Sequence, residues 1–363
     1  MDLNFTEEQQ MLRQTVRELC AKHSTPDQVR SLEEDAIGHR PELWQQLAQI
    51  GLTGLTIPEE FGGAGQGALE NVVVYEELGR ALASSPHFVS CVMAAGVLAR
   101  GGNEAAAKEW LPKIASGDSV LSIAWFEPDT SSDPRAVSTS VDGGRLTGVK
   151  TLVPFASAAE RLVVVARDGL YLVDPSAATI EPVPTMARDA SNLVRFEGVE
   201  AERVGDLDTW DDTSTDGMIA LAAYAVGGAE RALELTIEYA KERVQFDRPI
   251  GSFQGIAHPI ADMATEIEGS KVVTYEAAWA RAAGKPGADV LAAMAKYQAA
   301  DTFKRTTKVG QQVFGGVGFT LEIDMQLYFR RAKQLEVTWW DPAFLEERIA
   351  RAELDAQTPF VGL

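Results

Sequence analysis

The last third of the chain limits the possible folds more than any other part of the sequence. After Trp210, apolar residues recur with a period close to 3.6 residues through four long Ala-rich stretches, which predicts four long helices. Glycine and proline separate these stretches at residues 249–251, 284–287 and 315–318. Long helices with short connections pack as antiparallel neighbours, so the sequence predicts a four-helix bundle. The expected helices cover residues 213–243, 252–283, 287–315 and 324–356.

The first two thirds of the chain divide into a helical part and a strand-rich part. Thr6 precedes two glutamates and an apolar periodic stretch, which is typical of a helix N-cap. Pro41 and Gly51 bracket a second helix, as its first residue and its C-terminal glycine. From residue 119 onward, short runs rich in Val, Ile, Leu and Thr alternate with Gly, Asp and Pro turns. This spacing predicts a small β-barrel or β-sandwich.

Together these elements predict a mainly α fold with a middle β domain. A chain of 363 residues is long enough for two or three domains and for a core that encloses a bulky cofactor. The expected domains are an N-terminal helical domain at residues 1–117, a middle β domain at 118–211 and the C-terminal four-helix bundle at 212–363.

Charge and composition exclude several classes of function. The formal net charge of −20 argues against nucleic acid as a partner, because nucleic-acid affinity depends on clustered cations. No stretch approaches the ~20 apolar residues of a membrane-spanning helix, and the acidic N-terminal segment does not resemble a signal peptide. The four histidines and two cysteines show no metal-ligand spacing. We therefore expect a cytoplasmic protein without a metal site or a membrane span.

Two segments of the expected bundle carry residues suited to a phosphate-bearing ligand. The segment YAKERVQFDRPIGSFQ at 239–254 ends a helix in an arginine-rich turn, where Arg243 can bind a phosphate or pyrophosphate through paired hydrogen bonds. The segment QQVFGGVGFT at 311–320 ends a helix at Gly315 and Gly316, which leave the backbone open to close approach. This segment matches neither the Rossmann fingerprint nor the P-loop. Taken alone, each segment is also compatible with an ordinary solvated helix end.

Together, the two segments resemble the signatures RxQFxxPIxxFQ and QxFGGxGFT of the acyl-CoA dehydrogenase family. The stretch ELWQQLAQIGLTGLTIPEEFGGAGQG at 42–67 is similar to the opening helices and loop of that family, so the resemblance covers nearly the whole chain. It implies a flavoprotein that binds FAD across a subunit interface in a homo- or hetero-oligomer. The implied reaction removes hydrogens from Cα and Cβ of an acyl-CoA thioester, with electrons passing to an electron-transfer flavoprotein or a similar acceptor.

The resemblance also implies roles for individual residues at the cofactor. Arg243 would contact the FAD pyrophosphate of the neighbouring subunit, and Phe246 would pack beside the adenosine portion. Gln254 would help to fix the turn that carries them. The residues expected to meet the ADP part of FAD are Gln312, Gly315 and Gly316.

Both positions at which the family places its catalytic base are occupied by other residues. The usual glutamate position falls on Trp339 and the alternative position falls on Gly217, and neither residue can accept a proton. Asp216 is therefore the candidate base. However, a shift of one residue along a helix turns a side chain by about 100°. The alternative for Asp216 is a carboxylate near a helix N-terminus, where the helix dipole favours negative charge.

The expected flavin pocket also departs from the family. The family loop TEPxAGSD, whose threonine hydrogen-bonds the flavin ring, corresponds to FEPDTSSD at 126–133, so Phe126 replaces that threonine. The strand behind the flavin has the sequence KTLV at 150–153. Each lost hydrogen bond would weaken flavin binding by about 1 kcal/mol. Ser132 is a candidate contact for a CoA phosphate or ribose, with a turn-forming serine as the alternative.

These departures leave two main hypotheses open. In the first, the chain is an acyl-CoA dehydrogenase with a relocated base and an unusual acyl group. In the second, it is the catalytically silent subunit of a heteromeric dehydrogenase and completes the FAD site of a homologous partner. Such heteromers occur in the family for bulky sterol side-chain thioesters. A more distant hypothesis is a non-redox binding or scaffold protein with the same fold, against which the presence of Arg243, Phe246 and Gln312 argues.

Overall fold

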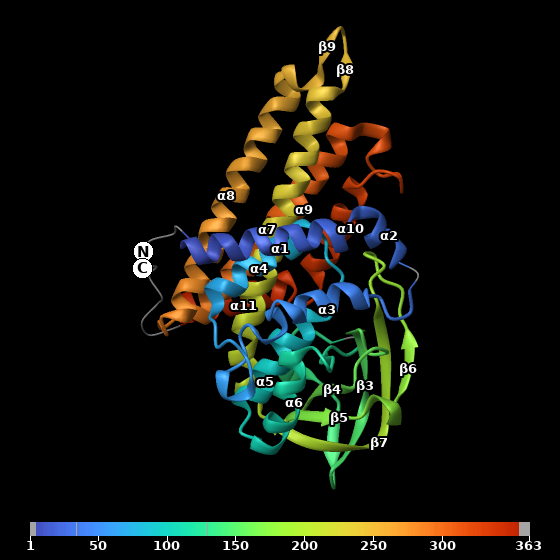
Figure 1. Ribbon diagram of the computed structural model, residues 1–363, viewed down its shortest axis with the longest axis vertical. Helices are drawn as coiled ribbons and strands as arrows, with labels where there is room; N and C mark the ends of the chain where they lie inside the picture. Colours follow the sequence, from blue (N-terminus) through green and yellow to red (C-terminus); the bar gives the residue numbers. More distant parts are fainter. Residues whose placement is uncertain (1–4, 34, 129, 356–363) are drawn as a thin grey trace. The chain divides into compact units, whose positions relative to one another are not determined.

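The computed structural model describes residues 5–33, 35–128 and 130–355 (Figure 1). The chain divides into two compact units. Unit 1 consists of Met1–Asp27, Val72–Ala83 and Met218–Leu363, and unit 2 consists of Gln28–Asn71 and Ser84–Gly217. These two units are not the three consecutive domains expected from the sequence. The expected domain boundaries stay predictions.

Unit 1 is helical. Its longest helices are α7 (Leu207–Glu242), α8 (Gln254–Ala282) and α9 (Ala288–Phe314), and α2, α4 and α7 contribute residues to both units. The other elements of unit 1 are α1 (Glu7–His23), the end of α4 (Ala68–Arg80), β8 (Val244–Gln245), β9 (Arg248–Pro249), η6 (Ile250–Ser252), η7 (Gly315–Val317), α10 (Met325–Val337), α11 (Pro342–Ala350) and η8 (Arg351–Asp355).

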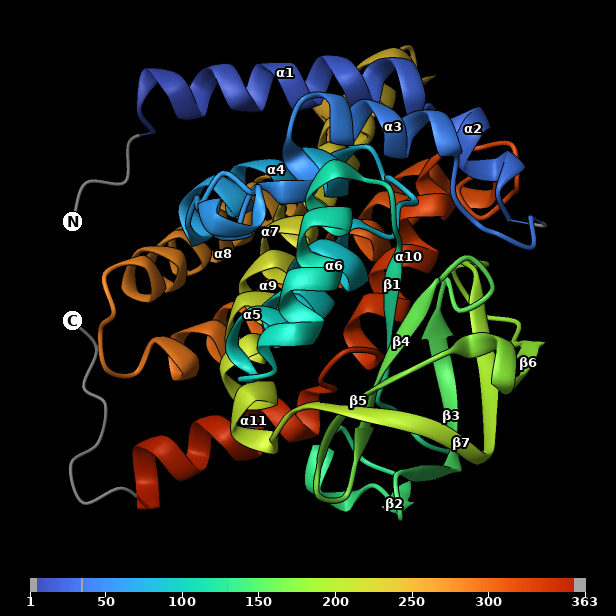
Figure 2. The same ribbon diagram turned by 60° about the horizontal axis from the view of Figure 1, so that its bottom comes forward.

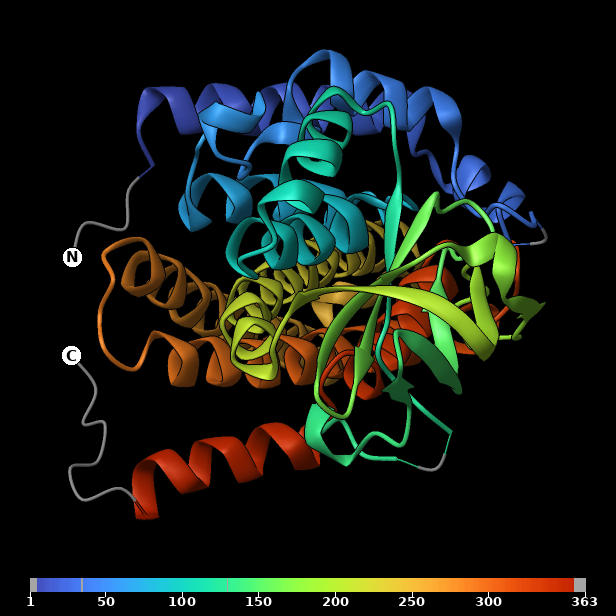
Figure 3. The same cartoon turned by 90° about the horizontal axis from the view of Figure 1, so that it is seen from below.

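Local sequence explains where these helices begin and how they pack. Thr6 and Gln9 form a reciprocal capping box at the start of α1, as the sequence predicts for Thr6. The helices α8 and α9 run side by side (Figures 1 and 3), joined by a short turn that ends at Gly287 with φ of 81°. The hydroxyls of Ser270 and Thr302 lie 2.8 Å apart between the two helices. Small residues thus allow the close packing that the Ala-rich pattern predicts.

The last predicted helix is wrong in one respect. The sequence predicts one continuous helix over 324–356, but α10 ends at Val337 and α11 starts at Pro342. Trp339 and Trp340 lie between them with positive φ angles of 53° and 70°, which end a right-handed helix. The carboxylate of Asp341 then caps α11 through the amides of residues 343 and 344. A proline as first helical residue and an aspartate N-cap give the new helix a well-defined start.

Unit 2 contains short helices and the β-sheet (Figure 2). The helical elements are α2 (Pro26–Ser31), α3 (Pro41–Gln49), η1 (Leu52–Gly54), η2 (Glu59–Phe61), the π-helical η3 (Phe88–Ala94), α5 (Ala95–Arg100), α6 (Glu104–Ser116), η4 (Pro134–Ala136) and η5 (Pro175–Ala177). The strands are β1 (Leu121–Ala124), β2 (Ser140–Asp142), β3 (Arg145–Pro154), β4 (Arg161–Ala166), β5 (Gly169–Val173), β6 (Thr179–Pro182) and β7 (Ser191–Gly205).

The seven strands form one sheet in the order β1-β4-β5-β7-β3-β2, with β6 beside β7. Only the β1–β4 pair is parallel among the described strands. The long strand β7 pairs with β3 through its first part and with β5 through its last part, so it links the two halves of the sheet. Apolar side chains from both halves share one core, which includes Val164, Tyr171, Val194 and Phe196. The predicted fold class, mainly α with a small β domain, is confirmed.

Two negative findings apply to the described part of the chain. Among its helices, none combines the length and the apolar character needed to cross a membrane. Its His, Cys, Asp and Glu side chains include no group of three or more placed to hold a metal ion.

Candidate functional site

The helices α7 and α9 run parallel and end at the same end of unit 1. A Cβ added to Gly228 of α7 would lie 2.5 Å from the ring of Phe303 in α9, so the helices approach closely there. Further along, the rings of Tyr239 and Phe314 stack with centroids 4.2 Å apart and planes 16° apart. The two contacts are separated by 11 residues on each helix (228 to 239 and 303 to 314), about three turns. The two phosphate-suited segments, each at a helix C-terminus, are therefore brought together.

We call this part of unit 1 the nucleotide end, formed by residues 239–254 and 311–321. A hairpin of β8 and β9 projects from it, at the top of Figure 1. Phe246 and Asp247 form the hairpin tip with φ of 53° and 61°, and Phe246 is 85% exposed. The guanidinium of Arg248 lies 4.1 Å from the ring centroid of Phe253 and so is engaged by a cation–π contact.

Arg243 follows the last turn of α7 and is exposed. Its amide donates to the carbonyl of Tyr239, and its carbonyl accepts from Ile250, so its backbone is fixed from both sides. Within the described residues its guanidinium has no hydrogen bond or ion pair. The side chains of Gln254 and Gln312 are also exposed and make no hydrogen bond to another described residue. Polar groups on a well-ordered backbone are thus available to an external ligand.

The glycine loop after α9 is open. Gly315 has φ of 68°, and no atom lies within 4 Å of a Cβ added to Gly315 or Gly316. The glycines therefore do not serve an internal contact, and an external group can approach the backbone from outside. Large apolar side chains surround the nucleotide end and are more than 40% exposed: Val244, Phe246, Val317, Phe319 and Leu321. Exposed apolar side chains gathered in one region are typical of an interaction surface.

These groups fit the ADP portion of a dinucleotide such as FAD. A free guanidinium suits a pyrophosphate, an uncommitted carboxamide suits ribose hydroxyls, and an exposed aromatic ring suits an adenine face. The sequence-based assignment of Arg243, Phe246, Gln254 and Gln312 to FAD stays a prediction.

The position expected for the family base lies in the turn at residues 338–341. Trp339 is half-buried there and its ring lies beside that of Trp340, with centroids 5.7 Å apart. The ammonium of Lys296, fully buried on α9, donates to the carbonyl of Leu335 at 2.7 Å and of Trp340 at 3.4 Å. Burial lowers the pKa of Lys296 to about 7, against the opposing effects of the nearby acidic side chains. Lys296, which is not among the site residues predicted from the sequence, thus anchors the turn through backbone carbonyls.

Asp216, the candidate base, is engaged by an arginine within unit 2. Its carboxylate accepts from Arg100 at 2.6 Å, and the same guanidinium lies 3.1 Å from Asp212. The alternative role of Asp216 at a helix N-terminus is wrong, because α7 begins at Leu207 and not near residue 213. Gly217 adjoins Asp216 on α7.

The loop that corresponds to the flavin-binding loop is built around a buried ion pair. Glu127 and Lys150 are 2% and 0% exposed, and their charged atoms lie 2.8 Å apart. Both carboxylate oxygens of Glu127 also accept amide and hydroxyl hydrogen bonds from Ser138 and Thr139. Burial opposes ionisation of Glu127, but Lys150 and these donors outweigh it and lower the pKa of the carboxyl to about 2. Burial lowers the pKa of Lys150 to about 8, against the effect of Glu127.

This ion pair fixes the loop to strand β3 without offering donors to a ligand. The ammonium of Lys150 also donates to the Trp125 carbonyl, and the Thr151 amide donates to the carbonyl of Phe126. Phe126 occupies the position of the family's hydrogen-bonding threonine. Ser132 is 1% exposed, and its contact with CoA stays a prediction. A lysine within strand-forming sequence, at position 150, was the signal for this pair.

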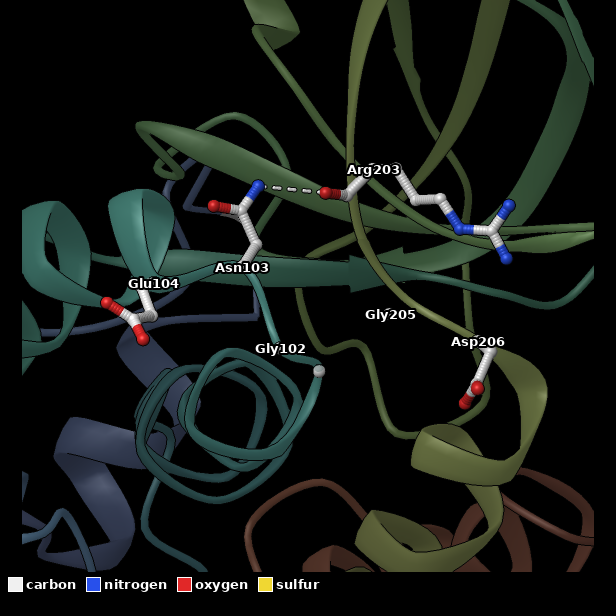
Figure 4. A pocket seen from close by; sticks show the side chains of 7 residues that line it. Gly102, Asn103, Glu104, Arg203, Gly205 and Asp206 are labelled. Carbon is white, nitrogen blue, oxygen red and sulfur yellow. Dashed lines mark hydrogen bonds between the residues drawn. The ribbon is translucent and has the colours of Figure 1, made fainter.

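An open cavity of about 590 Å³ lies in unit 2 between the starts of α6 and α7 (Figure 4). Its polar groups serve the fold: the Asn103 amide donates to the carbonyl of Arg203, and Asp206 accepts from the amide and hydroxyl of Thr209. Figure 4 shows the side chains of Glu104 and Arg203 pointing away from each other. None of the site residues predicted from the sequence lines this cavity.

The mainly helical fold with a central β-sheet is the fold of solved acyl-CoA dehydrogenases. Models of the acyl-CoA dehydrogenase N-terminal and C-terminal domains match residues 6–118 and 215–339. Acyl-CoA dehydrogenase FadE27 of Mycobacterium tuberculosis is 33% identical over 99% of this chain and 100% of its own length. The chain belongs to the acyl-CoA dehydrogenase family, as the sequence resemblance implies.

Two solved structures are similar over almost the whole chain. The ChsE4–ChsE5 complex from Mycobacterium tuberculosis contains a chain with a TM-score of 0.89 and 31% identity, covering 99% of this chain and 100% of that one. A structure described as a variant of the Tcur3481–Tcur3483 steroid ACAD gives a TM-score of 0.87 and 31% identity, covering 95% of this chain and 97% of that one.

Proposed function

We propose that this chain is the catalytically silent subunit of a heteromeric acyl-CoA dehydrogenase. In this proposal it completes the FAD site of a homologous partner, and the assembly carries out FAD-dependent α,β-desaturation of an acyl-CoA thioester. Its own counterpart of the active site performs no chemistry.

One contrast within the chain carries the proposal. The nucleotide end has an uncommitted guanidinium at Arg243 and an open glycine loop, whereas neither expected base position holds a proton acceptor. Trp339 occupies one position in a turn held by Lys296. Beside the other, Asp216 is committed to Arg100. A subunit that serves only a neighbour's cofactor needs the first set of groups and not the second.

Each residue of the nucleotide end has a separate task in this proposal. Arg243 binds the pyrophosphate of the partner's FAD, Phe246 packs beside the adenosine, and Gln312 hydrogen-bonds the ADP part next to Gly315 and Gly316. FAD supplies the acceptor for the hydride that leaves Cβ of the substrate. The groups of this chain bind and orient the cofactor, and the partner provides the carboxylate that removes the α-proton.

The substrate class we propose is a CoA thioester with a bulky acyl group, such as a sterol side chain. It is supported by the similarity to a steroid dehydrogenase of two named components and to the ChsE4–ChsE5 complex. We propose an electron-transfer flavoprotein or a similar carrier as the electron acceptor, and the cytoplasm as the location.

A second candidate function is an acyl-CoA dehydrogenase in which Asp216 acts as the base. It is favoured by the place of Asp216 beside the alternative base position on α7, with 19% of its side chain exposed. Such a role would require Arg100 to release the carboxylate when substrate binds.

The composition of the assembly tests the proposal. The chain is tagged and isolated from its native host, and the co-isolated proteins and the flavin content per chain are measured. We expect a second dehydrogenase-like chain with glutamate at the base position. We also expect well below one FAD per chain when this chain is produced alone. A full complement of FAD on this chain by itself would overturn the silent-subunit proposal.

A further inference from the structure

The nucleotide end consists of two segments that are far apart in sequence, and one aromatic contact joins them directly. We infer that Tyr239 and Phe314 are positioning residues whose stacked rings set the spacing between Arg243 and the Gln312–Gly316 loop. This inference rests on the proposed function, because it assigns the spacing to the binding of one FAD.

The stack lies next to both groups that it would position. Tyr239 is four residues before Arg243 and accepts the hydrogen bond from the Arg243 amide that closes the last turn. Phe314 follows Gln312 by two residues and directly precedes Gly315, where the chain leaves α9. The rings are nearly parallel, and the Tyr239 hydroxyl lies 3.5 Å from the Phe314 carbonyl. A movement of either ring would therefore move one binding segment relative to the other.

A second contact, one helical turn before the stack, restricts sliding of α7 along α9. Atoms of Thr236 in α7 and Met325 in α10 lie 2.8 Å from a Cβ added to Gly310 in α9. Thr236 is fully buried, and its hydroxyl donates to the carbonyl of Ala232. Because Gly310 admits no side chain, α7 and α9 are held close below the stack. The stack then fixes the last turn, beyond which both segments are exposed.

The chemistry of the ligand explains why this spacing matters. A guanidinium binds a pyrophosphate through paired hydrogen bonds of fixed geometry, while the carboxamide of Gln312 must meet another part of the same rigid ligand. A displacement of about 1 Å between two such groups costs much of the benefit of binding both. The side chains of Arg243 and Gln312 are exposed, and within the described residues they make no hydrogen bond that would hold them at a set distance.

The test compares leucine and phenylalanine at the same position. FAD is removed from the assembly isolated through this chain, and FAD affinity is measured by titration with flavin fluorescence. We expect Y239L to weaken FAD binding roughly three- to tenfold, because the aromatic stack is lost. Y239F keeps the stack and is expected to bind FAD within about twofold of the wild-type assembly. Tyr297, an exposed residue of α9 away from the nucleotide end, provides the matched control Y297L, which should also bind normally.

A double-mutant cycle separates positioning from a general loss of packing. If Tyr239 acts through Arg243, FAD affinity of the R243A/Y239L assembly should equal that of R243A within about twofold. Fully additive effects would overturn the inference. The inference would also be overturned if a folded Y239L assembly bound FAD normally while the R243A assembly had lost affinity. This second result would leave the proposed function standing.

A variant of Phe314, the other residue of the stack, provides a second test in case Y239L does not fold. F314L removes the same contact from α9 and should reproduce the loss seen in Y239L. Normal FAD affinity in F314L would contradict the inference. By contrast, normal FAD affinity in R243A would overturn the proposed function itself, so the two failures have different signatures.

Discussion

The nucleotide end of unit 1 and the 126–133 loop of unit 2 use their charged groups in opposite ways. At the nucleotide end, Arg243 is ordered by backbone hydrogen bonds while its guanidinium stays available. In the loop, Glu127 and Lys150 are buried, paired with each other and satisfied by neighbouring backbone and hydroxyl groups. The first arrangement is suited to a ligand and the second to the fold. A charged side chain at a family motif can therefore serve the fold, as the buried and paired Glu127 does here.

The largest effect that we predict is on stability and concerns the buried pair. E127Q leaves the Lys150 ammonium in the core without its counter-charge, which should lower the free energy of unfolding by about 3–5 kcal/mol. FAD content of the assembly that still folds should not change, because in our proposal the FAD belongs to the partner's site and not to this loop. Chemical unfolding and flavin absorbance measure the two effects.

The double variant E127Q/K150M is the matched control for this change. It removes both charges and should be more stable than E127Q alone. A folded E127Q assembly that loses FAD would break the comparison, because it would place flavin on the loop of this chain.

The same pair gives a pH dependence with a defined sign. The pKa of Glu127 is lowered from its usual 4.5 to about 2 in the folded protein. Its contribution to stability is therefore fully present above pH 4.5 and is lost as the pH falls through 2. The difference in unfolding free energy between wild type and E127Q should shrink over this range. Unfolding curves recorded between about pH 5 and pH 2 would show it, and a constant difference would contradict the assignment.

The next effect concerns the nucleotide end, where we expect a loss of FAD binding without a loss of stability. R243A removes a charged hydrogen-bonding group, which should weaken FAD binding by about 2–3 kcal/mol, or roughly 30- to 150-fold in Kd. The stability of the chain should hardly change, because the guanidinium makes no contact within the described residues. K241A removes a nearby exposed cation from α7 and serves as the control. Equal loss of FAD in both variants would mean that net charge, and not Arg243, binds the pyrophosphate.

Local signals in the sequence were sufficient for most elements of the fold. The strands Arg161–Ala166 and Gly169–Val173 are examples, because each is a short apolar run delimited by turn residues. The strand Thr179–Pro182 lacks this signal, since it contains a glutamate, ends in proline and is mostly exposed. The break at Trp339 was missed because tryptophan gives no local signal for a positive φ.

The site could be predicted only as two separate segments. Arg243 and Gln312 were recognisable from their motifs, whereas their proximity depends on the register of α7 and α9. That register is set by tertiary contacts such as the one between Gly228 and Phe303, which sequence periodicity does not specify. Likewise, a lone lysine in an Ala-rich helix was visible at position 296, but its carbonyl partners were not.

The smallest effect that we predict distinguishes the two candidate functions most directly. D216N keeps the size of the side chain and removes the charge that Arg100 binds at 2.6 Å. The pair is partly exposed, so the loss in unfolding free energy should stay below about 1 kcal/mol. Turnover of the assembly should be unchanged, because a carboxylate held by a guanidinium on α5 is not the proton acceptor in our proposal. D212N, which alters the weaker contact of the same arginine, controls for disturbance of α7. Loss of turnover in D216N but not in D212N, with FAD still bound, would assign the base to this chain, and the assembly would then contain two kinds of active site.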